Sequence, residues 1–226
     1  MKDRKSLLRT ILTIVLFGAV WGLLEATVGY ILHWMPAMIS GAVMVPIGTA
    51  LIYAAYRNTN MRTAILFAGL LAAGIKAINF AMPLPGGNIM KVLNPMISIL
   101  IETAVVYAAS FMFDRKTSPI KSTLLQVGTL AIVIVGWRVL FLANQGINYA
   151  ITGNLPGQLQ SAQSALSFVF YNGLFEFLIL GVIYAVYRVV SYFLAKREVR
   201  VAGPDWLVYV LSPLALVGAV LAVVLL

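Results

Sequence analysis

The chain has 226 residues, of which 62% are hydrophobic and 10% are charged, and its mean hydropathy is +0.96. A soluble domain carries roughly 25% charged residues, and several apolar runs here approach the ~20 residues that cross a bilayer. This composition excludes an ordinary soluble domain and predicts a single-domain, all-α polytopic membrane protein, a bundle of six to seven transmembrane helices in contact with lipid. The net charge of +9 does not indicate a nucleic-acid partner, because most basic residues lie in short loops between the predicted spans.

We predict seven spans, at residues 10–34, 39–56, 62–82, 92–113, 122–143, 164–190 and 205–226. If the spans alternate in direction, 13 of the 16 basic residues face one side of the membrane. These are Lys2, Arg4, Lys5, Arg9, Arg57, Arg62, Arg115, Lys116, Lys121, Arg188, Lys196, Arg197 and Arg200. The positive-inside rule therefore predicts a cytoplasmic N-terminus in a multi-pass protein of the cell (inner) membrane. We expect the basic start to precede a retained first helix and not a cleaved signal peptide.

The two external loops differ in kind. Residues 83–91 contain two prolines and two glycines and predict a compact turn, whereas residues 144–163 are polar, uncharged and long for a connection in a bundle. The longer loop is either a lid over an outward-facing site or an ordinary solvated loop. The seventh span is almost wholly apolar and is expected to be a lipid-facing addition to a six-helix core.

Small residues share one face of the first span with the carboxylate of Glu25. Gly18, Gly22, Ala26 and Gly29 follow one another at spacings of four, four and three. Such a face allows another helix to approach closely, so Gly18, Gly22 and Ala26 are candidates for contact with a partner helix. The same pattern is common wherever membrane helices pack, which leaves the identity of the neighbouring helix open.

Five ionisable residues lie within the predicted spans: Glu25, Lys76, Glu102, Arg138 and Glu176. A charge at membrane depth is costly and indicates a functional site, with the charges satisfied by pairing, protonation or a ligand. Three acids face two bases, so pairing leaves one carboxyl group over. Helical spacing adds Asn94 and Ser98 to the Glu102 face. The candidate substrate-binding residues are Glu25, Lys76, Asn79, Glu102, Arg138, Asn172 and Glu176, and the alternative is that they form interhelical bonds alone.

Motifs of enzymes and metal sites are absent from the sequence. There is no cysteine, a single histidine, no Gly-x-Ser-x-Gly elbow and no Gly-x4-Gly-Lys-Ser/Thr phosphate loop. We therefore expect no metal, no cofactor, no catalytic residues and no ATP hydrolysis by the chain alone. The favoured class is a non-enzymatic membrane transport protein.

In architecture, residues 1–200 resemble the substrate-binding S components of energy-coupling factor (ECF) transporters. The resemblance rests on the small size, the basic cytoplasmic side, Gly18 and Gly22 at the depth where that family meets its coupling subunit, and the glycine-rich second span around Gly41 and Gly48. It implies capture of a small-molecule substrate such as a vitamin on the outside. It also implies partners, namely a transmembrane coupling subunit and ATPases that drive uptake. The seventh span is additional to the six helices of that family.

Other functions remain open at this point. The main alternative is an ion- or proton-coupled carrier, or an ion-conducting subunit of a larger membrane complex, with a glutamate as the proton site. An intramembrane enzyme that works through its three buried glutamates, or a scaffold with purely structural charges, is less favoured by the sequence.

Overall fold

The computed structural model describes residues 2–32, 37–82, 89–113, 119–196 and 205–225. This part of the chain is helical and contains no strand. Its helices are α1 (Lys2–Leu32), α2 (Ala37–Thr59), α3 (Thr63–Ala77), α4 (Met90–Phe113), α5 (Pro119–Thr152), α6 (Ala162–Leu166), α7 (Asn172–Lys196) and α8 (Asp205–Leu225). Shorter segments are the 3-10 helices η1 (Ile78–Ala81) and η3 (Gly157–Leu159), and the π-helical turn η4 (Ser167–Tyr171).

Six helical stretches are long and apolar enough to cross a membrane. They are Ser6–Gly29, Thr63–Ala81, Met90–Met112, Val127–Thr152, Ala162–Val186 and Trp206–Leu225. The second predicted span lies within α2, which is not among these six but has 23 residues and is therefore about 34 Å long, enough for the ~30 Å hydrocarbon core. The predicted fold class is confirmed: the chain is a polytopic α-helical membrane protein.

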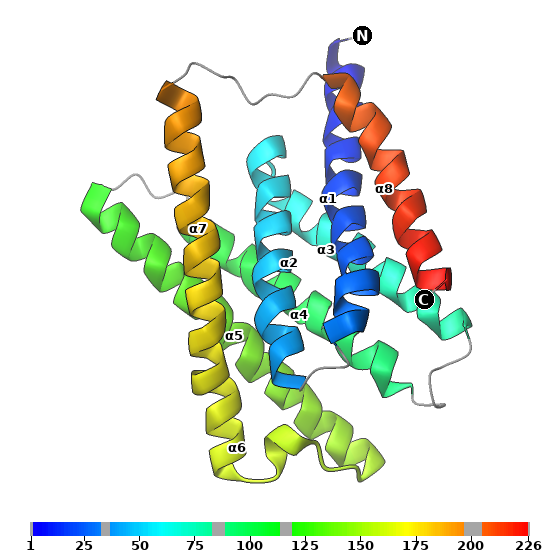
Figure 1. Ribbon diagram of the computed structural model, residues 1–226, viewed down its shortest axis with the longest axis vertical. Helices are drawn as coiled ribbons and strands as arrows, with labels where there is room; N and C mark the ends of the chain where they lie inside the picture. The colour runs from blue at the N-terminus through cyan, green and yellow to red at the C-terminus, as the bar shows by residue number, and fades with distance from the viewer. Residues whose placement is uncertain (1, 33–36, 83–88, 114–118, 197–204, 226) are drawn as a thin grey trace.

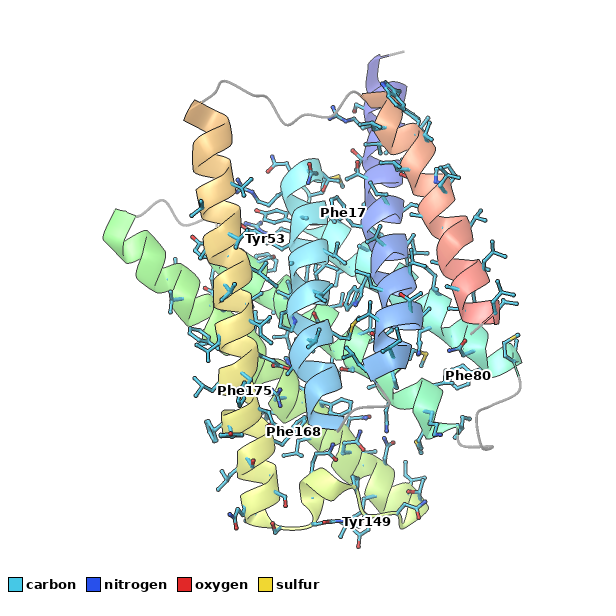
Figure 2. All side chains as sticks on the ribbon, in the orientation of Figure 1. Phe17, Tyr53, Phe80, Tyr149, Phe168 and Phe175 are labelled. Carbon is cyan, nitrogen blue, oxygen red and sulfur yellow. The ribbon has the colours of Figure 1, made fainter. Side chains whose placement is uncertain are left out.

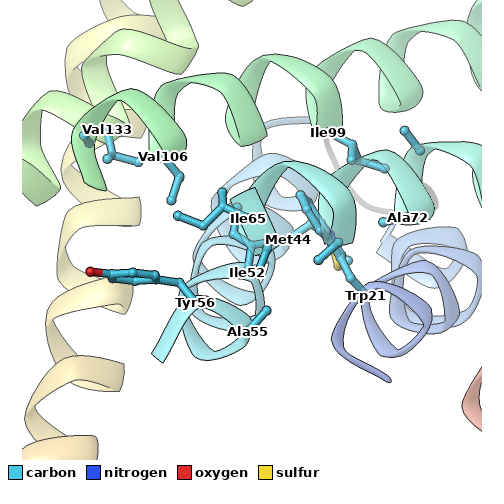
Figure 3. Close-up of a cluster of buried hydrophobic side chains, with 14 of the residues drawn as sticks. Trp21, Met44, Ile52, Ala55, Tyr56, Ile65, Ala72, Ile99, Val106 and Val133 are labelled. Atoms are coloured by element: carbon cyan, nitrogen blue, oxygen red, sulfur yellow. The ribbon is translucent and has the colours of Figure 1, made fainter. Parts of the chain in front are cut away.

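The helices form two crossing sets (Figure 1). In the front of the view, α7, α2, α1 and α8 stand side by side along the long axis, whereas α4 and α5 cross behind them at a steep tilt. Helix α2 contacts α1, α3, α4 and α7, which gives it a central place in the bundle. Its buried side chains Met44, Ile52 and Tyr56 belong to the main apolar cluster, together with Trp21 and Ile99 (Figure 3).

Glycines permit the closest helix contacts. A Cβ atom added at Gly18 would lie 2.7 Å from the Ala68 carbonyl oxygen, and one added at Gly22 would lie 2.7 Å from the Ile75 side chain. Both glycines therefore press against α3 of the same chain. The close approach that the small-residue pattern predicts is made inside the bundle, and Ala26 is likewise buried, in a cluster with Ile75 and α8.

The prediction of a long loop at 144–163 is wrong for its first half, which is helical. Helix α5 continues to Thr152, and Gly153, at φ 69°, ends it by donating its N–H to the Tyr149 carbonyl at 2.8 Å. The physical reason is that uncharged residues without proline or a glycine pair extend the helix until a left-handed glycine cap is reached. The rest of the expected loop holds η3 and the start of α6. The expected turn at 83–91 falls mostly outside the described residues.

Helix α8 packs against α1 at the edge of the bundle. The buried Ser212 hydroxyl lies 2.7 Å from the Leu12 carbonyl oxygen of α1 and 2.6 Å from the Val208 carbonyl of its own helix. Most of the large side chains of α8 remain exposed in the isolated chain, among them Leu214, Val217 and Leu225. This distribution fits a helix that faces lipid on its outer side.

The contact between α3 and α4 predicts a steric effect at Gly69. A Cβ there would lie 1.9 Å from Thr103 Oγ1, and the Thr103 hydroxyl is held by the Ile99 carbonyl at 2.7 Å. We expect Gly69→Ala to lower the free energy of unfolding by about 1–3 kcal/mol, as overpacking does. Thermal melting of the detergent-solubilised protein measures this. Gly74→Ala on the same helix is the control, because no atom lies within 4 Å of its added Cβ. Equal melting temperatures for the two variants would contradict the described α3–α4 packing.

Candidate functional site

A cavity of about 330 Å³ lies between α1, α2, α4 and α5 and is closed on one side by the segment that follows α5. This volume is at the lower end of the range for ligand pockets in proteins. Phe168 and Gln158 from that segment contribute to its lining. Figure 2 shows Phe168 and Tyr149 in the half of the bundle away from the N-terminus, so the cavity occupies that half.

Two of the predicted carboxylates line the cavity. Glu25 comes from α1 and Glu102 from α4, and Glu102 is only 2% exposed. The Thr49 hydroxyl of α2 donates a hydrogen bond to Glu102 Oε1 at 2.9 Å. Asn94 and Ser98, which precede Glu102 by two turns and one turn of α4, also line the cavity, as their four-residue spacing predicts.

Aromatic side chains form much of the remaining wall. Trp21 lies one turn before Glu25 on α1, Trp137 and Phe141 lie one turn apart on α5, and Phe168 lies in η4. The three rings of Trp137, Phe141 and Phe168 contact one another, with centroid separations of 5.7 to 6.2 Å. The wall therefore presents several aromatic faces and edges beside two carboxylates.

Residues at the end of the cavity near the start of α4 are more accessible. Lys91 is exposed, and Gln158 is half-buried. Lys91 is not one of the basic residues that gather at the N-terminal side, and no other lysine or arginine lines the cavity within the described residues. The cavity thus has an acidic interior and a single basic residue towards its accessible end.

An ion pair lies directly behind the aromatic wall. Arg138 Nη2 is 2.7 Å from Glu176 Oε1, and Arg138 Nε donates to Glu176 Oε2 at 2.9 Å. The Trp137 indole N–H donates to the same Oε2 at 3.1 Å. Arg138 is 1% exposed and Glu176 is 0% exposed, so the pair links α5 to α7 in the protein interior. Charge-assisted contacts of this kind offset part of the desolvation cost of a buried pair.

The π-helical turn η4 provides a further partner for Arg138. Its Nη1 donates to the carbonyl oxygen of Phe168, which lies within that turn. A π-helical turn shifts the backbone hydrogen bonds by one residue and is common at functional sites, since it offers carbonyl groups to other partners. One arginine thereby fixes both the Glu176 carboxylate and the segment that carries the Phe168 ring.

The structure gives one of the three buried acids a base as its partner. Glu176 pairs with Arg138. Within the described residues neither Glu25 nor Glu102 forms an ion pair, and Glu102 accepts a hydrogen bond from the Thr49 hydroxyl. Glu102 is the more deeply buried of these two carboxyl groups, at 2% exposed. It is therefore a buried carboxyl group in the cavity lining without a basic partner.

The predicted site residues separate into three groups. Glu25 and Glu102 line the cavity, and Arg138 and Glu176 form the pair behind its wall. The remaining three do not line it: Lys76 is buried in α3, Asn79 is half-buried in η1, and Asn172 is buried in α7. Gly18 and Gly22 of α1 contact α3, and neither lines the cavity.

The site residues predicted from the sequence do not include the aromatic residues of the wall. Aromatic residues make up 11% of the chain, and most of them are expected at interfaces or in packing. A usable signal was the four-residue step from Trp21 to Glu25, which places both on one helical face. Trp137 carried a second signal, since it directly precedes the buried Arg138. Phe168 carried none, because its position depends on η4.

Three comparisons with known proteins add no relative. No family model matches the chain, and neither a curated protein nor a solved structure matches it. Within the described residues, no group of three histidine, cysteine or acidic side chains is arranged to hold a metal ion. The fold and the cavity define a multi-pass α-helical membrane protein with a charged internal pocket.

The ion pair predicts a coupling between two substitutions. We expect Glu176→Ala to destabilise the protein by about 3–5 kcal/mol, because the Arg138 guanidinium would stay buried without its counter-ion. The double variant Arg138→Met with Glu176→Leu removes both charges and is expected to lose much less stability. Melting temperature and monodispersity in detergent measure both. A double variant that is less stable than Glu176→Ala would contradict this account of the pair.

Proposed function

We propose that this protein is a substrate-capturing subunit for the uptake of a small molecule, such as a vitamin, across the cell (inner) membrane. The observation that supports this best is the cavity with the unmatched carboxylate of Glu102 in its lining. A buried ionisable group without a counter-ion is costly, and a purely structural role offers no compensation for it. A ligand that enters the cavity supplies the missing partner.

The orientation follows from the charges. Most basic residues lie in the sequence at the N-terminus or in the predicted loops on its side of the membrane, and the positive-inside rule assigns that side to the cytoplasm. The cavity lies in the opposite half of the bundle. The pocket then faces outward, as capture from the surroundings requires.

Energy for uptake comes from partners in this proposal. The sequence holds no phosphate-binding loop for ATP, so the chain resembles the S components that work with a coupling subunit and ATPases. The glycines of α1 are already covered by α3. Docking of a coupling subunit therefore uses the exposed helix faces of the bundle, and not Gly18 or Gly22.

A second candidate function is a proton-coupled or ion-coupled carrier that works alone. The observation in its favour is the same Glu102, a buried carboxyl group without an ion-pair partner among the described residues, which can bind a proton in place of a ligand. The two functions differ in transport by the purified chain. A carrier moves its substrate in liposomes without partners, whereas a capturing subunit binds it and scarcely transports.

Filling the cavity tests the proposal. Gly41 lines it, and an added Cβ makes only ordinary contacts, 3.7 Å from Trp137 and 3.9 Å from Glu176 Oε1. We expect protein purified from native membranes to retain a small molecule. We also expect two ATPases and a coupling subunit to co-purify with it. Mass spectrometry detects both the small molecule and the partner proteins. Gly41→Phe is expected to abolish retention of the small molecule, and Gly41→Ala, the control, to keep it. A wild-type protein that is both empty and solitary would overturn the proposal in favour of the carrier.

Chemical labelling tests the orientation. The chain has no cysteine, so single cysteine variants have no background. We expect a membrane-impermeant maleimide to label Lys91→Cys on intact cells or spheroplasts, because Lys91 is exposed at the cavity end. Arg57→Cys, at the exposed end of α2, is expected to react only after the membrane is opened. The reverse pattern would place the cavity on the cytoplasmic side.

A further inference from the structure

We propose that the ligand of this cavity is a small organic cation, whose positive charge meets Glu102 and whose body lies against the aromatic wall. This inference rests on the proposed function and adds the chemical class of the substrate to it. It uses four observations: the unmatched acid, an unpaired acceptor atom, the aromatic wall, and the way in which the nearby basic groups are already engaged.

Three side chains of the cavity lining offer acceptor oxygens. Glu102 and Glu25 are carboxylates, and Asn94 Oδ1 is buried without a hydrogen-bond partner. A buried acceptor without a donor carries the full cost of its desolvation. A ligand with N–H groups or a positive charge satisfies these acceptors together, whereas an anionic ligand would place a further negative charge beside Glu25 and Glu102.

The bases near the cavity are not placed to receive an anion deep inside it. Arg138 is engaged by Glu176 and by the Phe168 carbonyl, behind the wall. Lys76 is buried in α3 and does not line the cavity. Lys91 does line it but is exposed. A positive charge on the ligand is thus favoured in the interior, and a neutral or anionic end is favoured towards Lys91.

The aromatic wall distinguishes an organic cation from an inorganic one. Cations are attracted to the faces of aromatic rings, and tryptophan is the strongest partner. The rings of this site already show that behaviour, because the Arg138 guanidinium carbon lies 5.2 Å from the Trp137 centroid and 4.8 Å from the Phe168 centroid. A metal ion would instead require several oxygen ligands at close range, and no group of three acids among the described residues provides them.

A matched pair of probes tests the charge. Choline is a small quaternary cation, and 3,3-dimethyl-1-butanol is its neutral isostere. We expect choline to change the tryptophan fluorescence of the full-length protein in lipid nanodiscs saturably, because Trp21 and Trp137 line the cavity. The isostere is expected to bind at least tenfold more weakly. Equal affinities, or no saturable signal with choline, would overturn the inference.

Two variants assign the effect to the cavity. Glu102→Gln keeps an oxygen for the Thr49 hydroxyl and removes the charge, so we expect choline affinity to fall at least tenfold while binding of the isostere is unchanged. Unchanged isostere binding also shows that the variant is folded. Arg57→Gln is the control, because Arg57 is exposed and does not line the cavity, and it is expected to leave choline affinity unchanged. Equal choline affinities for Arg57→Gln and Glu102→Gln would contradict the proposed position of the charge.

The experiments distinguish a failure of the cation class from a failure of the proposed uptake function. If native protein retains a small molecule that is neutral or anionic and choline does not bind, the uptake function stands and the cation class is wrong. If native protein retains nothing and has no partners, the uptake function itself fails.

Discussion

The arrangement of this bundle depends on how charge is balanced in an interior of low polarity. Each buried acid needs a base, a proton or a ligand, because the alternative is a large desolvation cost. The chain meets this requirement for Glu176 with Arg138, whereas Glu25 and Glu102 form no ion pair within the described residues. Glu102 is left with one hydroxyl. The position of the cavity beside this residue connects the charge balance to binding.

Two glycines of helix α2 make the arrangement possible, because they leave room beside it for the charged and aromatic side chains. A Cβ at Gly48 would lie 2.5 Å from the Trp21 ring and 2.8 Å from Glu102 Oε1. Two turns earlier, Gly41 lies beside Trp137 and Glu176. These two glycines let α1, α4, α5 and α7 bring their polar and aromatic side chains together around one helix, as small residues do in membrane bundles.

The segment between α5 and α7 links the stability of the bundle to the shape of the pocket. Arg138 holds Glu176 of α7 and the Phe168 carbonyl of η4, so the ring of Phe168 is fixed in the wall by the same interaction that joins the helices. Arg138 thus supports the binding site from outside the cavity and keeps a wall residue in place. Substitutions at Arg138 therefore act on stability and on the pocket together.

The sequence by itself determined the membrane class, the helical content and the buried charges, because each follows from local composition and from helical period. It also placed Asn94, Ser98 and Glu102 on one face of α4. It did not find the continuation of α5 to Thr152, which depends on where a left-handed glycine cap can form. Tertiary structure alone decided which acid pairs with a base and which aromatic residues form the wall. Those features depend on contacts between helices that are far apart in the chain, and no local pattern specifies such contacts.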